Sequence, residues 1–145
     1  MKKMQFSIEI HTSREKVWDT LWRDETFREW ANLIDAGTYM VGDLKEGGEI
    51  QFISANGYGV TSLVEKLTPG EFLLLRHQAD TQDEGWRERE KEWTGGEETY
   101  TLVDNDDATV FSVAFDVPPE QEEYFQTNYP KAMQQIKLLA EKDIQ

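Results

Sequence analysis

The chain has 145 residues, no cysteine, and a formal net charge of −14 from 29 acidic and 15 basic side chains. This length suits one domain (1–145) that can bury a hydrophobic core without disulfides. The lack of cysteine excludes thiolate metal sites, iron–sulfur clusters and a cysteine nucleophile. The acidic charge opposes nucleic acid and anionic membranes as partners, because binding to their phosphates depends on Lys and Arg.

The sequence predicts neither a signal peptide nor a membrane helix. Lys2 and Lys3 are not followed by the apolar segment that a signal peptide requires. No stretch approaches the roughly 20 apolar residues that span a bilayer. We therefore expect a soluble, cytoplasmic protein.

The N-terminal part of the chain predicts a strand followed by two helices. Residues 4–10 alternate between apolar and polar, which is typical of a strand. Residues 12–15 (Thr-Ser-Arg-Glu) match a capping box with Thr12 as the N-cap of a helix, and a second short helix is expected from Asp24. The apolar faces of the two helices consist of Val17, Trp18, Leu21 and Trp22, and of Phe27, Trp30, Ala31 and Ile34.

From Gly37 onward the sequence predicts strands separated by turns. Asn56 and Gly57 form the strongest short hairpin signal, because both residues tolerate positive φ. Residues 68–71 and 104–107 give further turns. The expected strands are 38–41, 49–55, 58–67, 72–78, 97–103 and 109–117.

Residues 79–94 interrupt this pattern. The segment is polar and then charged, with Trp86 and Trp93 at the two ends of its charged part. Long loops inside compact domains are often functional or mobile. We expect a mobile segment or one that contributes to the mouth of a cavity. Strand structure within 87–92 and an ordinary solvated loop are the alternatives.

Residues 119–142 predict a long C-terminal helix. Pro118 and Pro119 precede it, and acidic residues fill its first turn. Pro130 lies inside the helix, where a proline costs about 3 kcal/mol, so we expect a kink or break there. The apolar face consists of Phe125, Tyr129, Ala132, Met133, Ile136, Leu139 and Ala140.

The elements together predict the order β-α-α-β-β-β-β-β-β-α. Their short connections favour an antiparallel sheet with the helices on one face. We therefore expect an α+β helix-grip fold, in which a curved seven-stranded antiparallel sheet surrounds a long C-terminal helix.

Several segments resemble the SRPBCC (START-related) superfamily. Residues 6–18 (Phe-Ser-Ile-Glu-Ile-His-Thr-Ser-Arg-Glu-Lys-Val-Trp) and 27–30 (Phe-Arg-Glu-Trp) are similar to its opening. Residues 97–102, 109–113 and 129–132 are similar to the subgroup related to the activator of heat-shock-protein ATPase. The resemblance covers nearly the whole chain. It implies a cavity between the sheet and the C-terminal helix, in a superfamily whose members bind apolar or amphipathic molecules, catalyse their cyclisation or dehydration, or act as co-chaperones.

His77 is the most informative polar candidate. In the strand 72–78 it shares a face with Leu73 and Leu75, and the resemblance implies that this face looks into the cavity. An imidazole there suits a polar contact to a ligand or titration near neutral pH, and a core histidine bonded to a neighbour is the alternative. The residues expected to bind a ligand are Trp30, Leu75, His77, Trp86, Trp93, Tyr100, Tyr129 and Met133.

The sequence assigns no catalytic residue, metal site or cofactor. The serines lack a Gly-x-Ser-x-Gly elbow, and two separate histidines without cysteine do not predict a metal centre. We expect a protein that binds a small apolar or amphipathic molecule. One alternative is a co-chaperone-like interaction domain that contacts a protein partner through its acidic face and residues 86–93. The other is a cyclase or lyase, which would need a second polar partner for His77.

Overall fold

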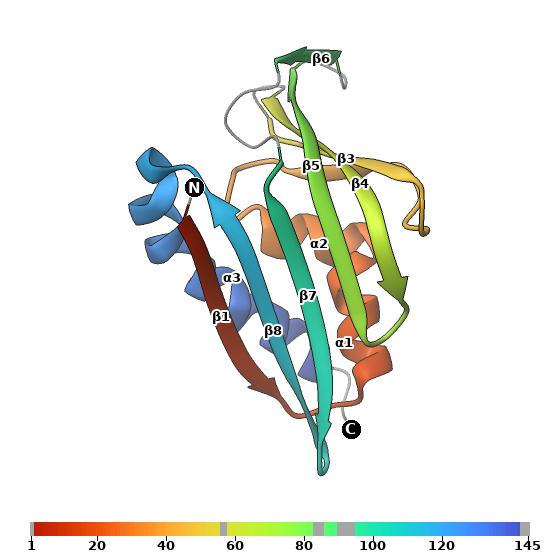
Figure 1. Cartoon of the computed structure of the whole chain (residues 1–145). Coiled ribbons are helices and arrows are strands. Elements are labelled where there is room, and N and C mark those ends of the chain that lie inside the picture. The colour runs from red at the N-terminus through yellow and green to blue at the C-terminus, as the bar shows by residue number, and fades with distance from the viewer. Residues whose placement is uncertain (1, 56–57, 83–85, 90–94, 143–145) are drawn as a thin grey trace.

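The computed structural model describes residues 2–55, 58–82, 86–89 and 95–142, which form one antiparallel sheet and a set of helices against it (Figure 1). The strands are β1 (Lys2–Ile10), β2 (Tyr39–Val41), β3 (Glu49–Ile53), β4 (Tyr58–Thr68), β5 (Phe72–Gln82), β6 (Trp86–Arg89), β7 (Glu97–Asn105) and β8 (Ala108–Val117). The helices are α1 (Arg14–Trp22), α2 (Asp24–Ala31) and α3 (Glu122–Glu141), with the short 3-10 helix η1 (Pro119–Gln121) before α3.

The sheet follows the path β1-β8-β7-β5-β4-β3-β2, and β6 pairs with β5 beside this path. The helices lie on one face of the sheet, and α3 contacts β1, α1 and α2 (Figure 1). The expected helix-grip fold with a curved seven-stranded antiparallel path is therefore confirmed. None of the helices in the described part of the chain has the length and apolar character that a membrane span requires.

Side-chain alternation decides which strand residues face the helices, since successive side chains point to opposite faces of a sheet. In β5, Leu73, Leu75 and His77 are buried on the helix-facing side, which we call the inner face. The intervening Arg76 lies on the outer face and is partly exposed. In β8, the buried inner-face residues are Thr109, Phe111, Val113, Phe115 and Val117.

Aromatic rings attach α3 to the inner face. The ring of Phe115 has its centroid 5.4 Å from that of Phe125 and 5.0 Å from that of Tyr129, both on α3. Tyr129 also stacks on Phe6 of β1, with the centroids 5.2 Å apart. The expected contacts of Phe125 and Tyr129 with the sheet are thereby confirmed.

The N-cap of α1 is Ser13, so the predicted cap at Thr12 was wrong by one residue. The Ser13 hydroxyl accepts a hydrogen bond from the Lys16 backbone N–H at 3.2 Å. Thr12 lies just beyond the end of β1, where its carbonyl accepts from the Thr109 hydroxyl at 2.8 Å and its N–H donates to the Ile10 carbonyl at 2.9 Å.

The segment 79–94 contains more strand than the sequence predicted. β5 continues to Gln82 instead of ending at 78, and β6 pairs back on it, with Gln82 opposite Trp86. Residues 83–85 and 90–94 lie outside the described residues, as do Asn56 and Gly57 of the predicted hairpin. The strands β3 and β4 on either side of that turn pair with each other as expected.

α3 continues through Pro130 as one helix, so of the kink or break that the sequence predicted, the break does not occur. Proline removes the N–H that would have bonded to the carbonyl of Gln126, four residues earlier. Both Pro130 and Gln126 are exposed, which leaves this carbonyl on the solvent side, where water can satisfy it.

Phe115→Ala is expected to lower the free energy of unfolding by about 3–5 kcal/mol, because it removes the ring on which α3 packs. Val103→Ala is the control, since Val103 is 55% exposed on β7 and its truncation should change stability by less than about 0.5 kcal/mol. Urea denaturation followed by circular dichroism measures both. Equal midpoints for the two variants would contradict the packing described here.

Candidate functional site

A cluster of polar side chains lies on the inner face beneath α3. Ser62 comes from β4, His77 from β5, Glu98 and Tyr100 from β7, and Tyr129 from α3. We call these five residues the polar cluster. Ser62, His77, Tyr100 and Tyr129 are each at most 3% exposed. Buried polar groups are costly unless they are bonded to one another, so their contacts define what this cluster can do.

Ser62 and His77 lie opposite each other in paired strands. The Ser62 hydroxyl and the His77 Nδ1 are 2.7 Å apart and share a hydrogen bond. The register of β4 and β5 shifts beside this pair, between Thr61 and Ser62. Such an irregularity can redirect a side chain.

Glu98 is the only acidic member of the polar cluster. Its register partners are Leu75 on β5 and Phe115 on β8, both buried on the inner face. The Tyr100 hydroxyl donates a hydrogen bond to the Glu98 carboxylate. The other carboxylate oxygen lies 3.5 Å from the His77 Nε2. The Glu98 side chain keeps 16% of its surface accessible, so a water-sized probe can reach it.

Burial controls the protonation of this cluster. It raises the pKa of Glu98 to about 7, although the hydrogen bond from Tyr100 acts in the opposite direction. Burial also lowers the pKa of His77 to about 4, against the charge of Asp116. The pKa values of Tyr100 and Tyr129 are raised well above 10, first by burial and then by the charge of Glu98. The interior therefore favours the neutral form of each group.

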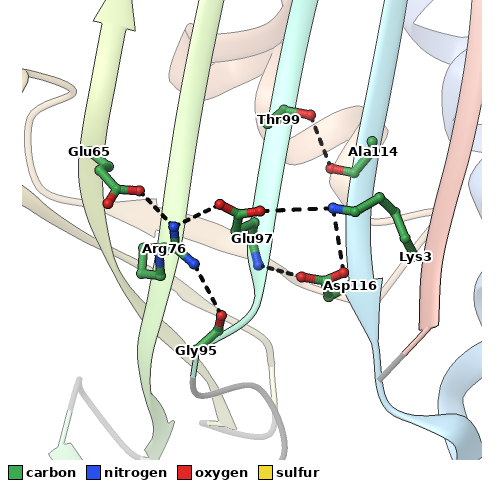
Figure 2. Close-up of polar contacts among 8 residues, drawn as sticks. All are labelled: Lys3, Glu65, Arg76, Gly95, Glu97, Thr99, Ala114 and Asp116. Carbon is green, nitrogen blue, oxygen red and sulfur yellow. Dashed lines mark hydrogen bonds and ion pairs between the residues drawn. The ribbon is translucent and has the colours of Figure 1, made fainter.

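The outer face of the same strands carries a chain of opposite charges (Figure 2). Arg76 donates to Glu97 at 2.7 Å and to Glu65 at 3.1 Å. Lys3 lies 4.0 Å from Glu97 and 3.5 Å from Asp116, and the Asp116 carboxylate accepts from the Glu97 backbone N–H at 2.9 Å. Two successive glutamates of β7 thus have opposite environments. Glu97 pairs with cations outside, while Glu98 points inward.

Four of the eight predicted ligand-binding residues lie in the polar cluster or directly opposite one of its members in the sheet. His77, Tyr100 and Tyr129 belong to the polar cluster, and Leu75 is the register partner of Glu98. Met133 is buried on α3, one turn beyond Tyr129. Trp30 is buried on α2, where its Nε1 donates to the Leu21 carbonyl at 3.2 Å and its ring meets that of Phe27 edge-on at 5.0 Å. Trp86 begins β6, and Trp93 lies outside the described residues.

The sequence interpretation missed Glu98 and gave Ser62 no role. Strand alternation contained the signal for Glu98, because Tyr100 and Leu102 are buried on the same face at two-residue spacing. Ser62 likewise shares its face with Val64, which is fully buried.

One buried donor beside the cluster lacks a partner. The Trp22 Nε1 has no hydrogen-bond acceptor in the part of the chain that the structure describes. The Trp22 ring meets the Tyr100 ring edge-on at 4.9 Å.

A separate pocket of about 200 Å³ lies where β1 meets the start of α3, lined by Lys2, Lys3, Met4, Gln5, Phe6, Glu122 and Gln126.

The curved antiparallel sheet and the C-terminal helix that covers it are the fold of the SRPBCC class. The model of the family described as Activator of Hsp90 ATPase homolog 1-like protein matches residues 11–141, and the chain belongs to this family. The predicted resemblance is thereby confirmed. A search of curated proteins found no significant match.

Solved structures with low sequence identity share the fold. Protein MLL2253 from Mesorhizobium loti matches with a TM-score of 0.74 and 16% identity, over 99% of this chain and 100% of its own. The Aha1 dimer from Colwellia psychrerythraea matches with a TM-score of 0.71 and 19% identity, over the whole of both chains. DynU16, from the dynemicin biosynthetic locus, matches with a TM-score of 0.69 and 11% identity, over 94% of this chain and 46% of its own.

Glu98→Gln and His77→Phe are expected to change the pH dependence of stability in opposite directions. The raised pKa of Glu98 gives stability that is full below pH 4.5 and is lost as the pH rises through about 7. The lowered pKa of His77 gives stability that is full above pH 6.5 and is lost as the pH falls through about 4. In the wild type the two effects oppose each other between pH 4.5 and 6.5.

Urea denaturation at pH 5 and pH 7 measures the difference. Relative to the wild type, Glu98→Gln should gain stability as the pH rises from 5 to 7, because the His77 effect remains alone. His77→Phe should lose stability over the same interval. Each change is expected to be on the order of 1–2 kcal/mol. Variants that both follow the wild-type pH profile would contradict the assigned pKa shifts.

Proposed function

We propose that this protein binds a small amphipathic molecule between the inner face of the sheet and α3, with the polar end of the molecule at the polar cluster. The observation that carries this proposal is Glu98. Its side chain lies on the inner face among apolar residues and keeps 16% of its surface accessible. A polar group that is buried and yet reachable is suited to orient a ligand.

The surroundings of the cluster suit the apolar part of such a molecule. Leu75 and Phe115 flank Glu98 in the sheet, Tyr129 of α3 packs on Phe115, and Met133 is buried one turn further along α3. Ligand sites in proteins are mainly apolar, with a few polar groups that fix orientation. Phe6, which stacks on Tyr129, also lines the pocket at the β1 edge.

Membership of the SRPBCC superfamily also supports a ligand-binding function. The superfamily includes ligand-binding and polyketide cyclase-like members, and DynU16 belongs to a biosynthetic locus. A cyclase or lyase function would need a second polar partner for His77, and Ser62 and Glu98 both lie close to it. This makes catalysis on the bound molecule the second candidate. A protein-interaction function is the outcome if no small molecule binds.

A screen of apolar and amphipathic compounds is expected to find ligands that raise the melting temperature. A ligand at about 100 times its Kd stabilises the folded state by about 2.7 kcal/mol, which is a shift of several degrees for a domain of this size. Nucleotides should give no shift, because the acidic chain repels their phosphates. If no compound in a broad lipid and metabolite panel shifts the melting temperature, the binding function is wrong.

Leu75→Arg is expected to abolish these shifts, because it places a charge where the apolar part of the ligand would lie. Val103→Arg is the matched control on the exposed side of the neighbouring β7, and it should retain them. Circular dichroism shows whether Leu75→Arg still folds.

His77→Phe tests the polar end without introducing a charge. It keeps a planar ring but removes the nitrogen atoms that face Ser62 and Glu98. Thermal shifts from ligands with polar heads should therefore fall more than those from wholly apolar ligands. Equal losses for the two kinds of ligand would show that His77 has only a packing role.

A further inference from the structure

We propose that the polar end of the ligand is a cation, such as a protonated amine, which pairs with Glu98 inside a group of aromatic rings. This inference rests on the proposed function and specifies the class of molecule. It depends on three features of the polar cluster: an inward carboxylate without a cation, the rings around it, and the neutrality of the other polar groups.

Glu98 lacks a positive partner in the described part of the chain. Its contacts there are with the Tyr100 hydroxyl and the His77 Nε2. Arg76 of β5 and Lys3 of β1 lie on the outer face and pair with Glu97, Glu65 and Asp116 (Figure 2). The charge compensation that Glu97 receives outside is therefore not available to Glu98 inside.

An unpaired carboxylate in an apolar interior either takes up a proton or acquires a cation. A ligand ammonium would supply that cation and make charge-assisted hydrogen bonds to the carboxylate oxygens. A neutral alcohol could bond to the same oxygens but would leave the charge uncompensated. A carboxylate or phosphate head would place a second negative charge beside the first.

The rings around Glu98 also suit a cation. Phe115 is its register partner and Tyr100 donates a hydrogen bond to it. The ring of Tyr129 packs on that of Phe115 at 5.0 Å and on that of Phe6 at 5.2 Å between centroids. The faces of aromatic rings attract cations, and this attraction is stronger away from water. The same rings provide the apolar contact for the body of the ligand.

The other titratable groups that face Glu98 do not oppose a cation. His77 from β5 is neutral at physiological pH, since burial lowers its pKa. Tyr100 from β7 and Tyr129 from α3 are neutral as well, and Ser62 from β4 is not ionised in this range. Asp116 of β8 acts on His77 through its negative charge. The electrostatic potential that these groups create at Glu98 is therefore close to zero or negative.

At any pH at which Glu98 is protonated in the ligand-free protein, binding of a cation should release that proton. Because burial raises the pKa of Glu98 to about 7, the affinity for an amine should fall as the pH drops from 7 to 5. The affinity for an alcohol of the same shape should change little. Titration calorimetry in buffers of different ionisation enthalpy measures the proton release directly.

The test uses two matched series: naphthylethylamine, naphthylethanol and naphthylacetate, and decylamine, decanol and decanoate below their micellar concentrations. In each series the amine is expected to bind at least about 10-fold more tightly than the alcohol, and the carboxylate most weakly. Glu98→Gln should reduce the affinity for the amine about 10-fold or more and leave the affinity for the alcohol within about 3-fold.

Glu97→Gln is the matched control. It removes the same charge from the adjacent residue of β7, but on the outer face. If the amines bind only through the overall acidity of the chain, the two variants will lose affinity equally, and the inference is wrong. Equal binding of all three heads would also overturn it, while leaving the proposed function intact. No binding by either series would contradict both.

Discussion

A glutamate on the buried face of the sheet, with no cation to compensate it among the described residues, is the constraint on which the account of this protein depends. Glu98 is placed there by strand alternation, since its neighbours at two-residue spacing, Tyr100 and Leu102, are core residues. Turning it outward would require a shift of register that moves those core residues to solvent. The fold therefore retains a carboxyl group in an environment that opposes its charge.

Glu97 and Glu98 are adjacent in β7 but lie on opposite faces of the sheet, in very different environments. Outside, Glu97 joins Arg76 and Lys3 in a chain of ion pairs across the sheet (Figure 2). Such partly exposed pairs contribute modestly to stability, but they hold the start of β7 against both of its neighbours. Inside, the contacts of Glu98 are with neutral groups. The outer pairs thus help to fix the position from which Glu98 points inward.

α3 covers the site on the side opposite the sheet. Tyr129 packs between Phe6 and Phe115 and also approaches the hydroxyl of Tyr100 and the carboxylate of Glu98. One residue of the helix therefore contributes both to the attachment of α3 and to the polar cluster. A ligand that enters between α3 and the sheet would contact the same rings that hold α3 in place. For this reason binding and stability are expected to be closely linked in this protein.

The sequence was sufficient to predict the fold because its patterns are local. Alternation predicted the strands, and the spacing of Phe125, Tyr129, Met133 and Ile136 predicted the buried face of α3, all within a few residues of the observed bounds. The error at the start of α1 came from competing local signals. Thr12 and Ser13 are both residue types that can cap a helix N-terminus. The hydrogen bond from the Thr109 hydroxyl to the Thr12 carbonyl comes from a distant strand, and the sequence around Thr12 does not show it.

The site was predicted less completely. His77, Tyr100 and Tyr129 were expected from their residue types and their faces. Glu98 was not, because the sequence contains 29 acidic residues and does not show which of them lacks a cation. That property depends on pairings between distant strands, which place Arg76 and Lys3 on the opposite face. Burial and charge compensation are tertiary properties, and they separate a functional carboxyl group from an ordinary one.

The protonation of Glu98 tests the central claim most directly. A ¹³C NMR titration of the glutamate side-chain carboxyl groups, with Glu98→Gln to assign the signal, measures its pKa in the intact protein. The account predicts a midpoint at about pH 7, well above the ordinary value of 4.5, because burial disfavours the charged form. A midpoint near 4.5 would show that Glu98 is solvated or paired with a cation, and would contradict the account.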